Sequence, residues 1–297
     1  MAFSSRASML CACIDIGSNT TRVLVAEAQP GRLVEVLQRR AFTRLGRGLK
    51  AGGSIPRAKI EEVVRVVADQ RTLAERVGAS ALRAVATAAI RGAANREEVV
   101  DAVREEGGVE LAVLDCDQEA RFAFLGATKT LGRPVDGRVA VVDVGGGSSE
   151  IAVGTLAGGV EWSSSFHIGS GFLTDHYAHS DPPSAAELHA MREHAQGVLE
   201  GLEIPPVESA IAVGGSATSV RRLVGSMLEP DTLQRALRVL SGAPAAEVAE
   251  RFALEPERVP LIPAGLLILD SVSQALGQPL LIGRGGLREG VLLDMAA

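Results

Sequence analysis

The sequence is short of several residue types, and each shortage excludes a class of protein. Its three cysteines cannot form a disulfide framework and lack the paired spacing of a zinc site, so we expect a reducing compartment such as the cytoplasm. No apolar run approaches the ~20 residues of a membrane-spanning helix. Acidic residues outnumber basic ones by 36 to 30, and the net charge of −6 argues against a dedicated nucleic-acid-binding protein. The 297 residues suffice for one large domain or two of about 130–150 residues.

Lysine is scarce as well. The lysines are Lys50, Lys59 and Lys129, and all other residues of the Lys and Arg set are arginines. The planar fork of arginine suits phosphate and carboxylate recognition. We attribute most of this bias to genomic composition and keep a functional interpretation for arginines near glycine turns. A loop with Arg44, Arg47 and Lys50 could guide a long polyanion, although an ordinary solvated turn explains it almost as well.

An internal repeat organises the chain. Residues 11–28 and 139–153 are each an apolar strand that ends in Asp-x-Gly, a turn of small residues, and a second strand with β-branched residues. The two aspartates, Asp15 and Asp143, lie 128 residues apart. This duplication predicts two structurally similar halves, each of which begins with a β-hairpin.

The elements that follow alternate between strands and helices, which predicts an α/β fold. In the first half we expect strands at 33–40, 82–86 and 109–114, and helices from Pro56 to Leu73, at 97–105 and at 118–131. In the second half we expect strands at 159–167, 209–213 and 280–282, and helices near 170–178, at 184–202, from Ala217, across 231–276 and from Leu287. The predicted domains are 9–132 and 133–297, with a hinge at 132–137, a terminal helix at 286–297 able to pack back on the first domain, and a disordered leader at 1–8.

Three glycine-rich turns are candidate phosphate sites. Gly17–Thr20 and Gly145–Ser148 lie at the tips of the repeated hairpins, and Gly214–Thr218 joins a buried strand to a helix. Glycines let backbone N–H groups converge on an anion, and a helix N-terminus adds to the attraction. Asp143 ends a buried strand, where an unpaired carboxylate is costly, so we expect a metal or a hydrogen-bond partner for it. One such turn would be a tight structural turn; three favour a phosphate site between the halves.

The combination of these turns resembles the acetate and sugar kinase/Hsp70/actin superfamily, and within it the exopolyphosphatase/guanosine pentaphosphate phosphohydrolase (Ppx/GppA) family. Four further segments are similar to motifs of that family, and the match runs from about residue 11 to 295. These segments are Arg-Leu-Gly-Arg-Gly-Leu at 44–49, Thr-x-x-x-Arg-x-x-x-Asn at 87–95, Gln-Glu-Ala-Arg at 118–121 and Gly-Leu-Arg-Glu-Gly at 286–290. The resemblance implies two ribonuclease H-like (actin-like ATPase) domains with a cleft between them.

The resemblance also implies a function, a Mg²⁺-dependent (or Mn²⁺-dependent) hydrolase that releases the terminal phosphate of inorganic polyphosphate, of guanosine pentaphosphate in the stringent response, or of both. Glu119 would be the general base. Arg91 would clamp a phosphate with its bidentate fork. Further phosphate contacts would come from Ser18, Asn19, Thr20, Gly145, Gly146, Gly147, Ser148, Gly214, Gly215 and Ser216. The metal would be held by Asp143, Glu150 and Asp15, since Mg²⁺ prefers hard oxygen ligands. A homodimer is compatible with the family; a membrane or a specific nucleic acid is not expected as a partner.

Three departures from the family pattern stand out. Asp115-Cys116 replaces the usual Ser-Gly, and Gln118 replaces the first acid of the pair, so Glu119 acts alone. Phe172 stands where the family commonly has an arginine. Longer relatives append helical domains beyond the point where this sequence ends, so we expect a preference for short polyphosphate.

Two other functions remain open from the sequence alone. One is an ATP-dependent kinase of the same superfamily, for which we find no convincing adenosine pocket or catalytic aspartate. The other is a non-catalytic, nucleotide-sensing actin-like protein. The five histidines show no metal-ligand spacing that favours a further site.

Overall fold

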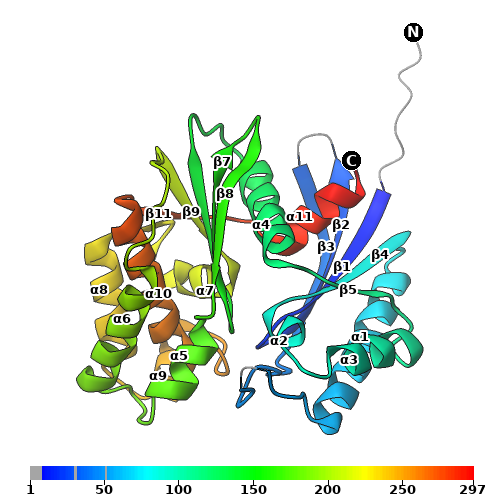
Figure 1. Cartoon of the computed structure of the whole chain (residues 1–297), viewed down its shortest axis with the longest axis horizontal. Helices are drawn as coiled ribbons and strands as arrows, with labels where there is room; N and C mark the ends of the chain where they lie inside the picture. Colours follow the sequence, from blue (N-terminus) through cyan, green and yellow to red (C-terminus); the bar gives the residue numbers. More distant parts are fainter. Residues whose placement is uncertain (1–8, 30–31, 51) are drawn as a thin grey trace.

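The computed structural model describes residues 9–29, 32–50 and 52–297, so the predicted leader at 1–8 lies outside the described residues (Figure 1). Its strands are β1 (Met9–Ile16), β2 (Thr21–Gln29), β3 (Arg32–Ala41), β4 (Ala81–Ala86), β5 (Leu111–Val113), β6 (Val139–Val144), β7 (Ser149–Thr155), β8 (Gly159–Phe166), β9 (Ser209–Val213), β10 (Met227–Leu228) and β11 (Leu280–Ile282). Its helices are α1 (Arg57–Arg76), α2 (Ala88–Arg91), α3 (Arg96–Glu105), α4 (Cys116–Thr130), α5 (Ser170–Tyr177), α6 (Ala185–Leu199), α7 (Gly214–Val224), α8 (Pro230–Leu240), α9 (Ala245–Phe252), the short 3₁₀ helix η1 (Val259–Leu261), α10 (Ile262–Leu276) and α11 (Leu287–Met295).

The first lobe is built on a five-stranded sheet in the order β3-β2-β1-β4-β5. Strands β1 and β2 form the repeated hairpin, while β4 pairs in parallel with β1 and β5 in parallel with β4. Four consecutive residues of β1, Cys11–Ile14, are fully buried, because helices cover both faces of the strand. Helices α1 and α3 pack on one face, and α11 packs on the other.

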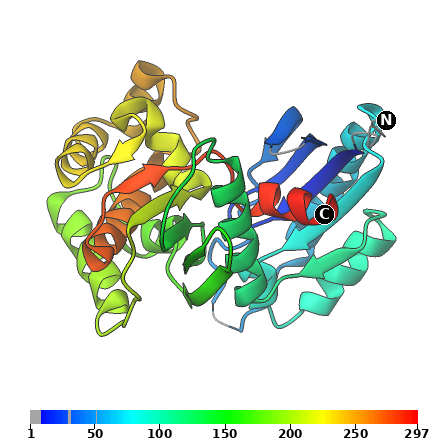
Figure 2. The same ribbon diagram turned by 90° about the horizontal axis from the view of Figure 1, so that it is seen from above.

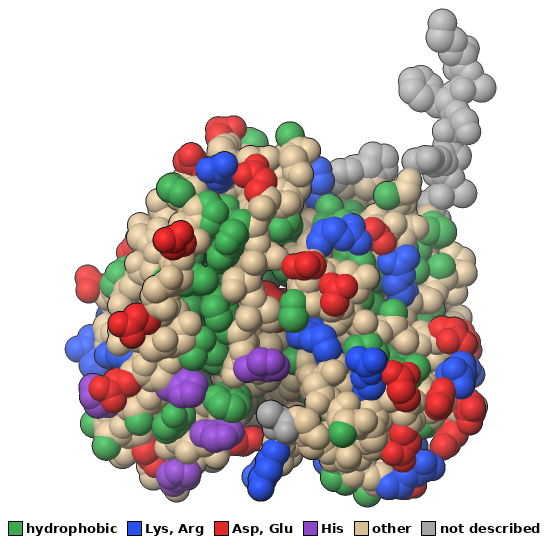
Figure 3. Space-filling model, in the orientation of Figure 1, with side chains coloured by type: hydrophobic (Ala, Val, Ile, Leu, Met, Phe, Trp, Pro, Cys, Tyr) green, Lys and Arg blue, Asp and Glu red, His purple; other side chains and the backbone are tan. Residues whose placement is uncertain are grey.

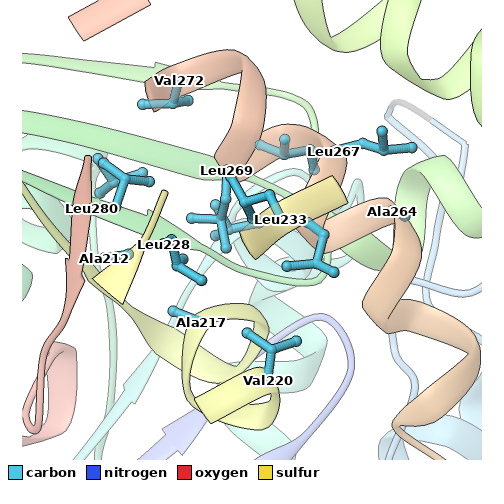
Figure 4. Packing of buried hydrophobic residues seen from close by; sticks show 14 of the residues in the cluster. Ala212, Ala217, Val220, Leu228, Leu233, Ala264, Leu267, Leu269, Val272 and Leu280 are labelled. Atoms are coloured by element: carbon cyan, nitrogen blue, oxygen red, sulfur yellow. The ribbon is translucent and has the colours of Figure 1, made fainter. Parts of the chain in front are cut away.

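The second lobe repeats this plan with a six-stranded sheet in the order β10-β11-β9-β6-β7-β8. Here β6 and β7 are the hairpin, and β9 runs parallel to β6. Figure 4 shows the main core of this lobe, which includes Leu267 and Leu269 of α10, Leu233 of α8 and Leu280 of β11. The prediction of an α/β fold with two similar halves is confirmed.

Helix α10 accounts for the most apolar stretch of the chain. The window Val259–Leu276 is long and apolar enough to cross a membrane by length and composition, with a mean hydropathy of 1.5. This stretch does not stand out in the sequence as one apolar run because Asp270 interrupts it. In the structure 72% of this window is buried inside the protein, so it serves as the central helix of a core.

Two helices lie side by side between the lobes (Figure 2). Helix α4 packs its alanines at 120, 123 and 127 on the second sheet, whereas α11 packs Leu287, Val291 and Leu292 on the first. Glycines make their close approach possible. A Cβ atom added to Gly126 would lie 1.9 Å from the carbonyl oxygen of Gly286, and one added to Gly290 would lie 1.9 Å from that of Phe122. The domain boundary at 132/133 stays a prediction, since α4 precedes it but packs mainly on the second sheet, whereas α11 follows it but packs on the first.

This contact gives a stability prediction. Gly290→Ala should destabilise the protein by about 1–3 kcal/mol or more, because the added methyl group meets backbone that has no room to move. Gly197→Ala is the matched control. Gly197 lies inside α6 with open space around its Cβ position, so the same change should leave stability unchanged or raise it by up to about 1 kcal/mol. Urea unfolding of both variants measures the difference; equal stabilities would contradict the close packing of α4 and α11.

Two helices begin earlier than the sequence predicted. Helix α7 begins at Gly214, not at Ala217, because a positive φ of 77° at Gly214 turns the chain straight from β9 into the helix. Helix α4 begins at Cys116, because Asp115 caps it. The Asp115 carboxylate accepts a hydrogen bond from the backbone N–H of Gln118 at 2.7 Å, and the side-chain oxygen of Gln118 accepts one from the backbone N–H of Asp115 at 3.1 Å. Two of the departures from the family pattern therefore form a helix cap.

Candidate active site

The two repeated hairpin tips face each other across the lobes. Each tip closes in the same way, with the Gly17 amide donating to Thr20 at 2.9 Å and the Gly145 amide donating to Ser148 at 3.0 Å. The tips also touch. A Cβ atom added to Gly147 would lie 2.5 Å from the Ser18 hydroxyl oxygen, so a side chain here would force the tips apart.

A cavity of about 130 Å³ opens between these tips and the start of α7. It brings together most of the predicted phosphate-binding residues, namely Ser18, Asn19, Thr20, Gly145, Gly146, Gly147, Ser148, Gly214 and Gly215. The side chains of Asp15, Glu119, Asp143 and Glu150 also line it. Residues that are 128 positions apart in the sequence thus converge on one site.

Two predicted phosphate ligands lie elsewhere. Ser216 does not line the cavity; it is buried on the opposite side of α7, where a Cβ atom on Gly265 of α10 would lie 2.8 Å from its hydroxyl oxygen. Its helical position turns it away from the two glycines before it. Arg91 does not line the cavity either. It lies behind Glu119 and contacts the site through that carboxylate.

Glu119 is held by a buried ion pair. Nη1 of Arg91 donates to the Glu119 carboxylate at 2.7 Å and to the carbonyl oxygen of Leu114 at 2.9 Å. The Glu119 side chain is 9% exposed. Burial raises the pKa of Glu119 to about 7, while Arg91 works in the opposite direction and Asp143 and Asp15 add to the rise. A carboxylate with such a pKa can take up and release a proton near neutral pH.

The remaining carboxylates sit on matching strand positions. Asp143 and Glu150 are directly opposite each other in the β6–β7 register, so both side chains point from the same face of the sheet. Burial, together with the charge of Asp15, raises the pKa of Asp143 to about 6. Burial and the charges of Glu119 and Asp143 raise the pKa of Glu150 well above its usual range, and Glu150 accepts a hydrogen bond from Ser165 at 2.9 Å.

These carboxylates are the place where a divalent cation would bind. One oxygen of Asp15, Oδ1, is buried without a hydrogen-bond partner, and its neighbour Asp143 is the second hard oxygen donor. The described part of the chain holds no cluster of three or more acidic, histidine or cysteine side chains that would complete a site alone. Mg²⁺ is commonly bound by one or two carboxylates together with waters and substrate phosphates, so the donor set fits it. Glu150 would have to release a proton to join them.

Four arginines that were given no role from the sequence also line the cavity, namely Arg22, Arg258, Arg284 and Arg288. Nε of Arg22 donates to Thr20 at 3.0 Å, and Nε of Arg258 donates to Ser219 at 3.0 Å. Within the described ranges neither guanidinium forms an ion pair with a carboxylate. Burial and the other arginines lower the pKa of both. A buried cation such as Arg258 and a partly buried one such as Arg22, neither paired with an acid, favour an anionic ligand.

A signal for one of these arginines was present in the sequence. Arg22 stands opposite Asp15 in the β1–β2 register, as Glu150 stands opposite Asp143 in the second copy. The repeat therefore marks the position of Arg22, but the residue type changes from acid to base. Arg258 lies far from any glycine turn in the sequence and gave no such signal.

Phe172, which replaces the family arginine, takes a structural position. Its backbone N–H donates to the carbonyl oxygen of Gly146 at 3.0 Å, and its ring stacks on His176 with the centroids 4.1 Å apart. Figure 3 shows histidines gathered on the lower part of the second lobe, and no histidine of the described chain lines the cavity. The basic side chains that line the cavity in the described chain are thus all arginines.

The basic loop at 44–50 adjoins the first hairpin tip. The Arg44 amide donates to Asn19 at 2.9 Å, and the Gly46 amide donates to Ser18 at 2.7 Å. Arg47 and Lys50 are exposed. The loop is thus placed to support the tip, and its role in guiding a polyanion stays a prediction.

Comparison with known proteins shows the family to which the chain is related. The Ppx/GppA phosphatase family matches residues 24–297. Exopolyphosphatase 1 of Mycobacterium tuberculosis is 30% identical over 298 residues, which cover 94% of this chain and 86% of that protein. The crystal structure of the Aquifex aeolicus member of the Ppx/GppA family has 30% identity and a TM-score of 0.80, with 97% of each chain covered.

A second solved structure shows the same fold at lower identity. An exopolyphosphatase from Cytophaga hutchinsonii superposes with a TM-score of 0.84 at 20% identity over 97% of each chain. The family match and the relative at 30% identity span most of the chain. This chain therefore belongs to the Ppx/GppA phosphatase family.

Proposed function

We propose that this protein releases the terminal phosphate of inorganic polyphosphate by hydrolysis, with Glu119 as the general base. One observation carries the proposal. A buried carboxyl group whose pKa is about 7 faces a cavity whose other walls are glycine turns and arginines. Hydrolysis of a phosphoanhydride needs this combination, a base for the attacking water and fixed positive charge for the phosphates.

The position of each residue in the cavity indicates its role in binding or hydrolysis. The backbone N–H groups of the hairpin tips and of Gly214 and Gly215 cradle the phosphates. Glu119 accepts the proton of the water that attacks the terminal phosphorus, and Arg91 orients the Glu119 carboxylate. Arg22 and Arg258 stabilise charge on the remaining phosphates. Asp143 and Asp15 would hold Mg²⁺ or Mn²⁺, which when bound neutralises phosphate oxygens.

The lining of the cavity favours polyphosphate over the alternatives. Its apolar side chains are Val144, Val213 and Leu287, and no aromatic ring of the described chain lines it. A kinase would need apolar walls for adenine, which this lining does not supply. Guanosine pentaphosphate ends in the same phosphoanhydride, so we propose it as a second, weaker substrate whose guanosine would lie outside the cavity.

A substrate panel tests this proposal. Purified protein with Mg²⁺ is incubated separately with polyphosphate, guanosine pentaphosphate, and ATP with and without a sugar or a carboxylic acid. We expect phosphate release from the first, slower release from the second, and no consumption of ATP that depends on an acceptor. Consumption of ATP only in the presence of an acceptor would identify a kinase and overturn the proposal.

The pKa of Glu119 predicts the pH dependence. A general base must be deprotonated, so kcat/KM should fall by about tenfold for each pH unit below about 7. Arg91 lowers the pKa of Glu119. Arg91→Gln should therefore move the acidic limb of the pH profile, the fall in kcat/KM, to higher pH and lower the activity at neutral pH. Glu203→Gln, an exposed change between α6 and β9, should leave the profile unchanged. A limb that stays in place in Arg91→Gln would show that another group titrates.

A further inference from the structure

An ion pair joins the two lobes beside the arginine-lined part of the cavity. Arg40 lies near the end of β3 in the first lobe, and its Nη1 pairs with the carboxylate of Glu255, in the loop between α9 and η1 of the second lobe. The two side chains are 30% and 45% exposed. The pair thus lies at the surface, where solvent and an incoming anion can reach it.

Arg40 and Glu255 both lie next to arginines that line the cavity. Arg40 is directly opposite Arg22 in the β2–β3 register, so the two side chains share a face of the sheet. The Arg258 amide donates to the carbonyl oxygen of Glu255 at 2.9 Å. The guanidinium groups of Arg22 and Arg258 meet at Gly215, where a Cβ atom would lie 2.9 Å from the first and 1.9 Å from the second.

The three arginines form a path from the cavity to the surface. Arg258 is buried, Arg22 is partly buried and Arg40 is the most exposed of the three. Arg40 lowers the pKa of both other arginines, as expected of a nearby like charge. Glu255 forms its ion pair with the outermost cation, Arg40, and its charge also acts on Arg258, whose pKa it raises. The cavity measures about 130 Å³, so it encloses only the end of a long polyphosphate, and the rest of the chain must leave it.

We propose that the Arg40–Glu255 ion pair is a latch that sets the chain-length preference of the site, an inference that rests on the proposed function. A short polyphosphate occupies the cavity and leaves the latch closed. A longer chain extends past Arg22 and Arg258 and meets the Glu255 carboxylate, which repels it. The chain must separate Glu255 from Arg40, and it then gains Arg40 as a further phosphate contact.

Two variants break the same ion pair and should act in opposite directions. Glu255→Gln removes the repelling charge and frees Arg40, so the KM for long-chain polyphosphate should fall by about threefold to tenfold relative to that for tripolyphosphate. Arg40→Gln removes the contact that a long chain gains, so the same ratio should rise by a similar factor. If the pair were only a brace between the lobes, both variants would move the ratio in the same direction or not at all.

A matched pair elsewhere on the second lobe supplies the control. Nε of Arg138 and the Glu161 carboxylate are 2.9 Å apart with similar exposure and do not line the cavity, so Glu161→Gln should leave the ratio unchanged. Equal ratios in the unmodified protein, Glu255→Gln and Arg40→Gln would overturn the latch while leaving the proposed function intact. If the unmodified protein hydrolysed no polyphosphate, the proposed function would fail instead.

Discussion

Replacing Glu119 with glutamine is expected to lower kcat for polyphosphate by about 10²–10⁴-fold and to change substrate binding little. Glutamine keeps the size and hydrogen-bonding reach of the side chain but cannot accept the proton of the attacking water. The phosphate contacts come from the hairpin tips, α7 and the arginines, none of which the substitution touches. Steady-state kinetics and calorimetric binding of polyphosphate separate the two effects.

The adjacent residue provides a control for this prediction. Gln118→Glu restores the acidic pair of the family, yet Gln118 serves the helix cap with Asp115 and does not line the cavity. Glutamate can form the same capping box, so activity should stay close to that of the unmodified protein. Full activity in Glu119→Gln, or an equal loss of binding and turnover, would exclude Glu119 as the base and make Asp143 the next candidate.

Asp143→Asn should have the second-largest effect, a fall in kcat on the order of 10²–10³-fold and a higher Mg²⁺ concentration for half-maximal activity. The Asp143 carboxylate lies close against Gly214, since a Cβ atom added to Gly214 would be 2.1 Å from Oδ1 of Asp143. Asparagine has the same size as aspartate and fits this space, so the fold should persist. The substitution also removes a charge that raises the pKa of Glu119, so the acidic limb of the pH profile should move to lower pH.

Three further measurements make the Asp143 prediction specific. Asp231→Asn, an exposed change on α8, should leave both the rate and the Mg²⁺ dependence unchanged. Thermal unfolding of Asp143→Asn should match that of the unmodified protein; a large loss of stability would indicate a structural carboxylate. Activity of the unmodified protein that survives excess chelator would show that no metal is needed.

The internal repeat made the fold predictable from the sequence. Because Asp15 and Asp143 end equivalent strands, the sequence predicted two hairpins, and the structure pairs their strands with the same turn in both copies. Strand β9 was predicted with its correct bounds. Helix starts were less accurate, because a cap such as Asp115 or a glycine with positive φ such as Gly214 sets them, and both act before the apolar pattern of the helix begins.

The site was predictable only where a local motif marked it. The glycine turns and Glu119 lie in short, recognisable segments, and they converge as expected. Arg258 is brought to the cavity by the loop before η1, a tertiary contact without a sequence pattern. Ser216 lies away from the cavity because the helix starts at Gly214, which turns the serine towards α10. Arg91 was predicted to clamp a phosphate, whereas the structure pairs its side chain with Glu119.

The most direct test of the account is ³¹P NMR of long-chain polyphosphate during incubation with the protein and Mg²⁺. Removal of terminal phosphates one at a time should make the orthophosphate signal grow and the signal of internal phosphates fall, while the signal of chain ends stays constant. Glu119→Gln should slow this change without altering its pattern. A rising signal of chain ends would show cleavage inside the polymer, and unchanged spectra would show no hydrolysis; either result would contradict a site that binds and cleaves the terminal phosphate.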